Sequence, residues 1–138
     1  MNMTAMITRS KFSDSTDSLL RFAMRLDATL TGLLGLSIAA MADPLASLTG
    51  LTAAQGYIAG AAFVLCGLVV YALAATPDLR RVGTAMAVSN GVGTVGLVAV
   101  AAAGVLPLTT FGVITALAAG FYTAIFAVLQ YLGVRRLV

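Results

Sequence analysis

The chain has 138 residues, of which 60% are hydrophobic and only 9% are charged, and its mean hydropathy is +1.02. Soluble domains carry about 25% charged residues, so this composition excludes an ordinary water-soluble domain and predicts a protein surrounded by a lipid bilayer. The net charge of +3 comes from Lys and Arg residues at the ends of apolar runs, with no aromatic or polar interleaving, and we therefore expect no nucleic-acid partner.

Four long apolar segments predict four transmembrane helices. Residues 1–17 are polar and rich in Ser, Thr and Asp, and they predict a flexible cytoplasmic tail before a transmembrane domain over residues 18–138. The first helix is expected over about residues 18–41, because Pro44 cannot continue helical pairing. The second is expected over 52–75, where the spacing of Thr52 and Gln55 predicts a capping box.

The third predicted helix covers residues 77–104, with Thr76 as its N-cap and Pro77 as its first residue. The fourth covers 109–132 and is opened by Thr109 or Thr110. The segments 43–52 and 105–109 are expected to be loops. The predicted fold is therefore an all-α, four-helix transmembrane bundle made of two helical hairpins.

The basic residues predict how this bundle is oriented. They precede or open the first helix, lie between the second and third, and close the chain: Arg9, Lys11, Arg21, Arg25, Arg80, Arg81, Arg135 and Arg136. The segments 43–52 and 105–109 contain no Lys or Arg. The positive-inside rule then places both termini in the cytoplasm.

Small residues predict where the helices approach one another closely, since helix association in lipid depends on backbone contact rather than hydrophobic burial. The candidate packing positions are Gly56, Gly60, Gly83, Gly91, Gly112 and Gly120. These glycines are either all used inside one bundle, or one row remains outside and forms a homo-oligomer or docks a larger membrane complex.

Polar side chains at membrane depth are the candidate functional residues, because such residues are rare there. Counting back about twenty residues from Ala42, at about 1.5 Å per residue, puts the inner membrane boundary near Ala23. Asp27 then lies inside the membrane. Thr31 is expected one turn above Asp27, and Gln130 at a depth comparable to that of Asp27. Asn90 is expected deeper, with Tyr122 and Cys66 at a level similar to that of Asn90. These residues could line a small inward-facing polar pocket.

Two interpretations of Asp27 stay open. It is either a structural acid that bonds to a neighbouring helix, or a carboxylate that binds a proton or cation in a small transporter. Asn90 is expected to join helices through its amide. Cys66 is expected to be a small apolar filler.

Most catalytic and metal chemistry lacks its usual residues. The chain has one Cys and no His, so it can form no internal disulfide and lacks the common zinc and haem ligands. No nucleophile–base pair or phosphate loop is present. We expect no cofactor, no metal and no enzymatic activity.

Several short segments resemble a group of four-span bacterial membrane proteins with no assigned activity. They are Asp27-Ala-Thr-Leu-Thr-Gly32, Pro44-Leu-Ala, Tyr71-Ala, Arg80-Arg81, Asn90 and Leu129-Gln130-Tyr131-Leu-Gly133-Val-Arg135-Arg136, within about residues 19–136. The resemblance implies four spans and a bacterial inner membrane.

The predicted function is that of a non-enzymatic polytopic membrane protein, an accessory subunit or a small assembly-forming bundle. The alternative is a small proton- or ion-coupled transporter or channel that uses Asp27.

Overall fold

The computed structural model describes the backbone of residues 3–138 and the side chains of residues 16–138. Its helices are α1 (Met3–Ala40), α2 (Ala42–Thr49), α3 (Ala53–Leu73), α4 (Leu79–Ala103) and α5 (Thr110–Arg135). Residues Thr16–Ala40 of α1 and the whole of α3, α4 and α5 are long and apolar enough to cross a membrane. The prediction of an all-α chain with four long apolar helices is confirmed for the described residues.

The first helix starts earlier than predicted. Helix α1 begins at Met3 instead of near residue 18. The predicted tail over residues 1–17 falls mostly on residues whose side chains lie outside the described part of the chain, and residues 1 and 2 lie outside it entirely. The flexibility of this segment and its cytoplasmic location therefore stay predictions.

The segment 43–52 was predicted as a loop, and this prediction is wrong, because most of it forms α2. Pro44 has no N–H group that could donate to the Ala40 carbonyl. Helix α1 therefore ends at Ala40, before the proline, as expected. In α2 the same proline lies in the first turn, where the N–H groups have no helical partner in any case. Gly50, with φ of 83°, then ends α2 in the left-handed conformation that favours glycine.

The helix caps agree with the sequence at two places and differ at a third. Thr52 and Gln55 form the predicted capping box of α3. Thr109 caps α5 by accepting a hydrogen bond from the Gly112 N–H. Helix α4 begins at Leu79 with Asp78 as its N-cap, so the prediction of a Thr76 cap is wrong. Asp is among the strongest N-cap residues, and Asp78 stands directly before the helix.

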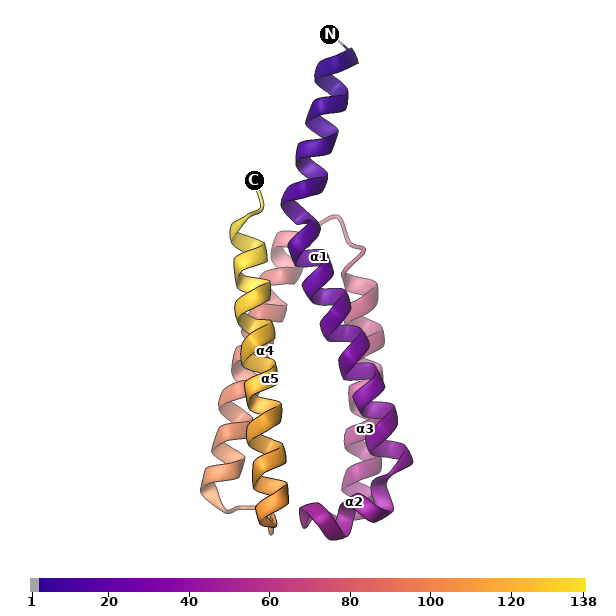
Figure 1. The fold of residues 1–138 in the computed structure, drawn as a ribbon, viewed down its shortest axis with the longest axis vertical. Coiled ribbons are helices and arrows are strands. Elements are labelled where there is room, and N and C mark those ends of the chain that lie inside the picture. The colour runs from indigo at the N-terminus through magenta and orange to yellow at the C-terminus, as the bar shows by residue number, and fades with distance from the viewer. Residues whose placement is uncertain (1–2) are drawn as a thin grey trace.

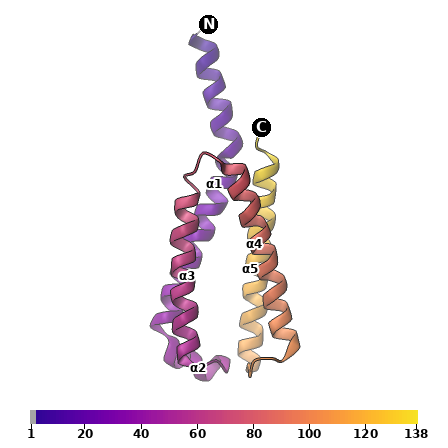
Figure 2. The same cartoon turned by 180° about the vertical axis from the view of Figure 1, so that it is seen from behind.

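The helices form two pairs, in which α1 packs along α3 and α4 packs along α5 (Figures 1 and 2). Thr16 of α1, the α3–α4 connection and Val138 lie together at one end of the molecule, which we call the C-terminal end. Helix α2 and the α4–α5 connection lie at the other end, the α2 end. The pairs meet mainly where α1 contacts α5 and where α2 contacts α5.

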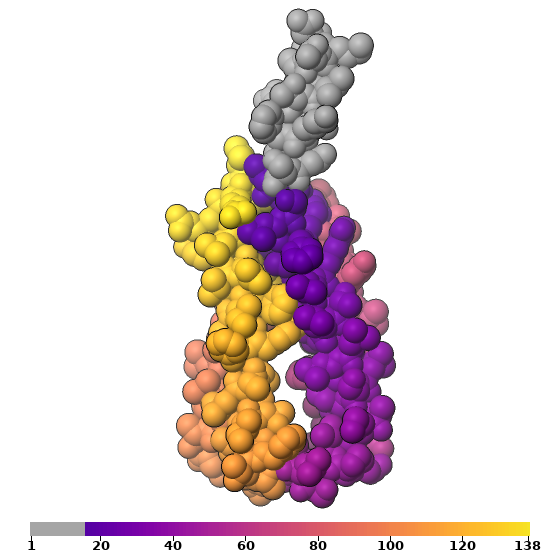
Figure 3. Space-filling view, viewed as in Figure 1, coloured from indigo at the N-terminus to yellow at the C-terminus, as the bar shows by residue number. Residues whose placement is uncertain are grey.

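An opening separates the two pairs between these meeting points. The space-filling view shows it passing through the molecule between α1 and α5 (Figure 3). We call it the inter-pair opening. The apolar core lies on its C-terminal side, where Leu20, Met24, Ala74 and Leu79 pack together and Leu20 and Met24 are fully buried.

Five of the six predicted packing glycines lie at helix contacts. A Cβ on Gly60 would lie 2.7 Å from the Gly35 carbonyl oxygen, and one on Gly83 would lie 2.5 Å from a Leu20 methyl carbon. Gly112 faces the Thr49 carbonyl. The looser contacts are those of Gly56, 3.1 Å from Ala42, and Gly120, 3.6 Å from Leu97.

Gly91 makes no helix contact inside the bundle, since no atom lies within 4 Å of the position its Cβ would take. A packing role for Gly91 outside the bundle stays a prediction. Successive helical residues point about 100° apart. Because Asn90 faces the neighbouring helices, Gly91 is turned away from them. Three glycines inside helices that were not predicted make tight contacts: Gly35 against α3, Gly67 against α1 and Gly133 against Leu20.

Candidate functional site

The polar side chains predicted at membrane depth lie together, beside the inter-pair opening. Asp27 shares a face of α1 with Leu20, Met24 and Thr31, because residues three and four apart lie on one side of a helix. This face points to α5, and Asp27 is 5% exposed while Gln130 of α5 is fully buried. Protein atoms therefore cover Asp27 and Gln130 almost completely, whereas Thr31, Asn90 and Tyr122 are half-buried.

One carboxylate oxygen of Asp27 faces two amides. Asn90 of α4 donates from Nδ2 to Asp27 Oδ2 at 2.9 Å, and Gln130 donates from Nε2 to the same oxygen at 2.9 Å. The Asn90 amide also donates to Gln130 Oε1 at 2.9 Å. These bonds join α1, α4 and α5 at a single point.

The other carboxylate oxygen faces two hydroxyl groups. Tyr122 of α5 donates to Asp27 Oδ1 at 3.0 Å and lies 3.2 Å from the Asp27 main-chain oxygen. Thr31 donates to Oδ1 at 3.2 Å, and its hydroxyl lies 3.1 Å from that of Tyr122. We call the five residues Asp27, Thr31, Asn90, Tyr122 and Gln130 the Asp27 cluster.

The Asp27 carboxylate is surrounded by neutral hydrogen-bond donors. The ion pairs among the described residues join Arg21 to Asp17 and Arg81 to Asp78, and neither involves Asp27. Within that same part of the chain no buried side-chain nitrogen or oxygen lacks a hydrogen-bond partner. A carboxylate taken out of water is costly unless it is paired or well bonded, and here four neutral groups supply the bonds.

Apolar residues seal the Asp27 cluster on its C-terminal side. Leu20 and Met24 are fully buried there. Phe126 of α5 is 5% exposed, and its ring lies 4.8 Å from that of Tyr122. On the other side, a hydroxyl pair of Thr94 and Thr123 joins α4 to α5 at 2.8 Å. The cluster is thus shut toward the C-terminal end and adjoins the opening.

All four predicted polar candidates, Asp27, Thr31, Asn90 and Gln130, belong to this network. Tyr122, which was expected at a similar depth, belongs to it as well. Cys66 does not: it is exposed on α3, and α3 presents glycines rather than Cys66 to α1. Residue spacing did not show on which side of α3 Cys66 lies.

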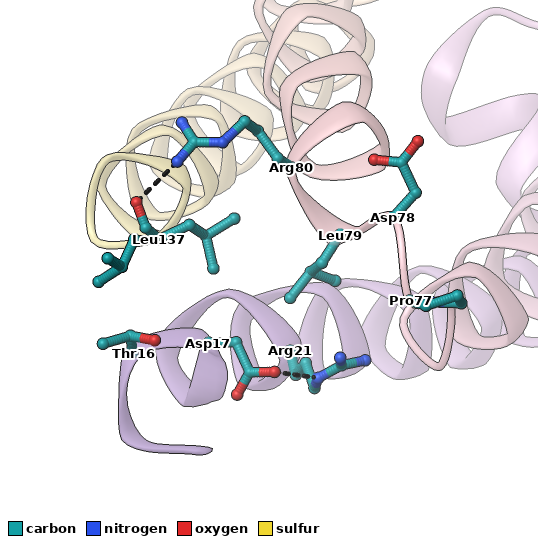
Figure 4. A pocket seen from close by; sticks show the side chains of 9 residues that line it. Thr16, Asp17, Arg21, Pro77, Asp78, Leu79, Arg80 and Leu137 are labelled. Atoms are coloured by element: carbon teal, nitrogen blue, oxygen red, sulfur yellow. Dashed lines mark hydrogen bonds and ion pairs between the residues drawn. The ribbon is translucent and has the colours of Figure 1, made fainter. Parts of the chain in front are cut away.

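A second group of polar residues lines a shallow pocket at the C-terminal end (Figure 4). Arg21 bonds to Asp17 at 2.9 Å and donates to the main-chain oxygens of Ala74 and Thr76 at 2.7 and 3.3 Å. Arg80 donates to the Leu137 main-chain oxygen at 2.7 Å. These bonds tie the α3–α4 connection to α1 and the end of the chain to α4.

No family model, curated protein or solved structure matches this chain. The resemblance to four-span bacterial membrane proteins therefore stays a proposal. What the Asp27 cluster can bind or stabilise follows from the chemistry of its own side chains. A carboxylate held by four donors, in a cluster without a thiol, imidazole or amine, is suited to holding helices together or to binding a cation.

Proposed function

We propose that the chain is a non-enzymatic polytopic membrane protein, either an accessory subunit or a small assembly-forming bundle of a bacterial inner membrane. One observation carries this proposal: the polar side chains of the Asp27 cluster are hydrogen-bonded to one another and so join α1, α4 and α5. Interhelical hydrogen bonds of this kind serve assembly in membranes.

The inter-pair opening supports an assembly role (Figure 3). Beyond Thr31, Leu34 continues the face of α1 that carries Asp27 and is 45% exposed. Helix association in lipid rewards close packing. The exposed apolar side chains beside the opening can pack against a further helix, from a second copy or from a larger complex.

Purification of the native protein from its own membrane, in mild detergent, tests this role. We expect either a stable partner or a homogeneous homo-oligomer, identified by native mass spectrometry. A monomer with no partner, obtained in several mild detergents and in nanodiscs, would contradict the proposal.

The proposed orientation has both termini in the cytoplasm, with each helix pair forming a hairpin. It is supported by Arg80, Arg81, Arg135 and Arg136, which are all exposed at the C-terminal end. Cysteines introduced at Ser47 and Val105, in a Cys66→Ser background, should react with an impermeant thiol reagent added to intact cells. A cysteine at Val138 should not react. The reverse pattern would show the opposite orientation.

A small ion-coupled transporter is the second candidate function. It is favoured by one observation, a buried carboxylate that no Lys or Arg of the described residues contacts. Intramembrane carboxylates of this kind mark proton and ion sites in many transporters. Uptake of a labelled cation into liposomes that contain wild type or Asp27→Asn tests it, and equal uptake by both proteins would exclude Asp27 from transport.

A further inference from the structure

We infer that the hydroxyl side of the Asp27 cluster binds a small monovalent cation, Na⁺ or Li⁺, through Asp27 Oδ1, Tyr122 OH and Thr31 Oγ1. This inference deepens the second candidate function, because it names the ion that such a function would use. It does not depend on the assembly role, so the two can fail separately.

The two sides of the Asp27 carboxylate differ in what they can accept. On the Oδ2 side, the NH₂ groups of Asn90 and Gln130 only donate, and they hold that oxygen from two helices. On the Oδ1 side, the hydroxyls of Tyr122 and Thr31 can donate or accept. A cation can therefore join Oδ1 while the amide bonds to Oδ2 stay in place.

The hydroxyl protons have other acceptors within reach. Tyr122 OH lies 3.2 Å from the Asp27 main-chain oxygen and can donate there. Thr31 Oγ1 lies 3.1 Å from Tyr122 OH and can donate to it. When both protons turn in this way, Oδ1 and the two hydroxyl oxygens all keep lone pairs for a cation. No buried polar group then loses its hydrogen bond.

Charge and spacing limit the kind of cation. The cluster contains one carboxylate, so a monovalent ion neutralises it, whereas a divalent ion would leave an excess charge in a region of low dielectric. The distances between the three oxygens are 3.0, 3.1 and 3.2 Å. Ligands at right angles with this spacing lie about 2.1–2.3 Å from a central ion, in the range of small, hard cations with oxygen ligands. Water completes the coordination shell.

The route to this site comes from the α2 end. Leu20 and Met24, both fully buried, block the C-terminal side. On the other side, Leu34 continues the face of Asp27 and Thr31 along α1, and Thr115 continues the face of Tyr122 along α5. Both are exposed, and the inter-pair opening lies between their helices (Figure 3).

Thermal unfolding of the purified full-length protein tests this site. Melting temperature is measured at constant pH and ionic strength while choline chloride is replaced by NaCl, LiCl or KCl. An ion that binds only the folded state raises the melting temperature in a concentration-dependent manner. We expect Na⁺ and Li⁺ to stabilise the wild type and K⁺ to act at least tenfold more weakly. Isothermal titration of the wild type with NaCl gives a second measurement that needs no variant.

Three variants locate the effect. Asp27→Asn should abolish the response to Na⁺, and Tyr122→Phe should weaken the apparent affinity at least tenfold. Thr94→Val is the control. It removes one hydroxyl of the Thr94–Thr123 pair, and this pair contains no carboxylate. Its melting temperature should respond to Na⁺ like that of the wild type. If Asp27→Asn does not fold, the wild-type titration and Tyr122→Phe still decide the question.

Three results would overturn the inference: a wild-type melting temperature that is independent of Na⁺, an equal Na⁺ response in Asp27→Asn, or no heat of Na⁺ binding to the wild type. A stabilisation that follows pH alone and disappears in Asp27→Asn would also overturn it, and would assign the carboxylate to a proton. Copurification of the variants separates this result from the assembly role. A variant that keeps its partner but loses the Na⁺ response affects the ion site only.

Discussion

The two ends of the molecule join the same helix pairs in different ways. At the C-terminal end, α1 meets α5 through the buried hydrogen bonds of the Asp27 cluster, with Leu20 and Met24 packed beside it and Gly133 directly against Leu20. At the α2 end, the contacts are to main-chain carbonyl groups, and the Thr109 hydroxyl donates to the Leu48 carbonyl. The Thr109 N–H donates to the Thr49 carbonyl at 3.0 Å, and Gly112 lies directly against the same carbonyl.

This difference shows how a small bundle can be fixed without a hydrophobic driving force. Lipid tails are as apolar as the helices, so apolar contact alone gives little preference for one arrangement. The C-terminal end gains specificity from hydrogen bonds that few other arrangements would satisfy. The α2 end depends on residues without a Cβ, which let two main chains touch. Steric substitutions should therefore act at both ends, and the loss of a buried polar pair should act at the C-terminal end.

The largest effect is expected for Gly133→Leu. A Cβ at this position would lie 2.9 Å from the Leu20 Cα, so the larger side chain must push α1 away from α5 and distort the Asp27 cluster. We expect a loss of about 3 kcal/mol in unfolding free energy, measured in detergent. Gly91→Leu is the control, since nothing lies near that position, and it should change stability by less than about 0.5 kcal/mol.

Gln130→Leu keeps the approximate size of a buried side chain and removes its hydrogen bonds. Asp27 loses a donor to its charge, and Asn90 loses an acceptor. The expected loss is about 1.5–2 kcal/mol in the same unfolding assay. Val128→Leu, on the lipid-exposed side of α5, should be neutral. Equal stability of the two variants would show that polar pairing does not hold this end.

Gly112→Ala tests the α2 end. Its new methyl group would fall on the Thr49 carbonyl, so α2 must move away from α5. We expect a loss of about 1 kcal/mol together with faster hydrogen exchange in α2. Exchange around Met24 should not change. Gly120→Ala, whose Cβ would make only ordinary contacts at 3.6 Å, serves as the control. Faster hydrogen exchange at both ends would mean that a change in packing at the α2 end also loosens the C-terminal end.

The smallest effects are expected when one tyrosine hydroxyl group is removed at each end of the molecule. Tyr122→Phe removes a hydroxyl bonded to Asp27, and Tyr57→Phe removes one bonded to exposed Asp43 at 3.0 Å. Water can replace the second bond but not the first. We expect losses of about 1 kcal/mol for Tyr122→Phe and below about 0.5 kcal/mol for Tyr57→Phe. The opposite order would contradict the distinction between the ends.

The depth of the polar residues could be estimated from the sequence because helical rise is constant. Counting residues from the helix ends placed Asp27 and Gln130 at comparable levels. It put Asn90 deeper, although the Asn90 amide reaches both of them. The capping box at Thr52 could be predicted for a similar reason, since it depends only on local spacing. Both estimates need no knowledge of how the helices are arranged.

Properties that depend on that arrangement could not be predicted. Spacing alone does not say which side of a helix meets a neighbour, so Gly91 was selected and Gly133 was missed. Helix α2 was missed because Asp43 and Pro44 are typical of turns, although both are also favourable in a first helical turn. The guanidinium of Arg21 was taken only as an orientation signal, yet it binds the carbonyls of Ala74 and Thr76.

The distances along the sequence between Asp27 and its partners have a consequence for membrane insertion. Asn90, Tyr122 and Gln130 follow Asp27 by 63, 95 and 103 residues. A nascent chain that has released only α1 and α3 into the bilayer therefore holds a carboxylate whose sole cluster partner is Thr31. Chains that stop before α4 keep this acid in lipid without its donors from other helices, and such an acid is costly there. Complete and truncated chains therefore differ in whether Asp27 has its hydrogen-bond donors. Membrane quality control can detect this difference.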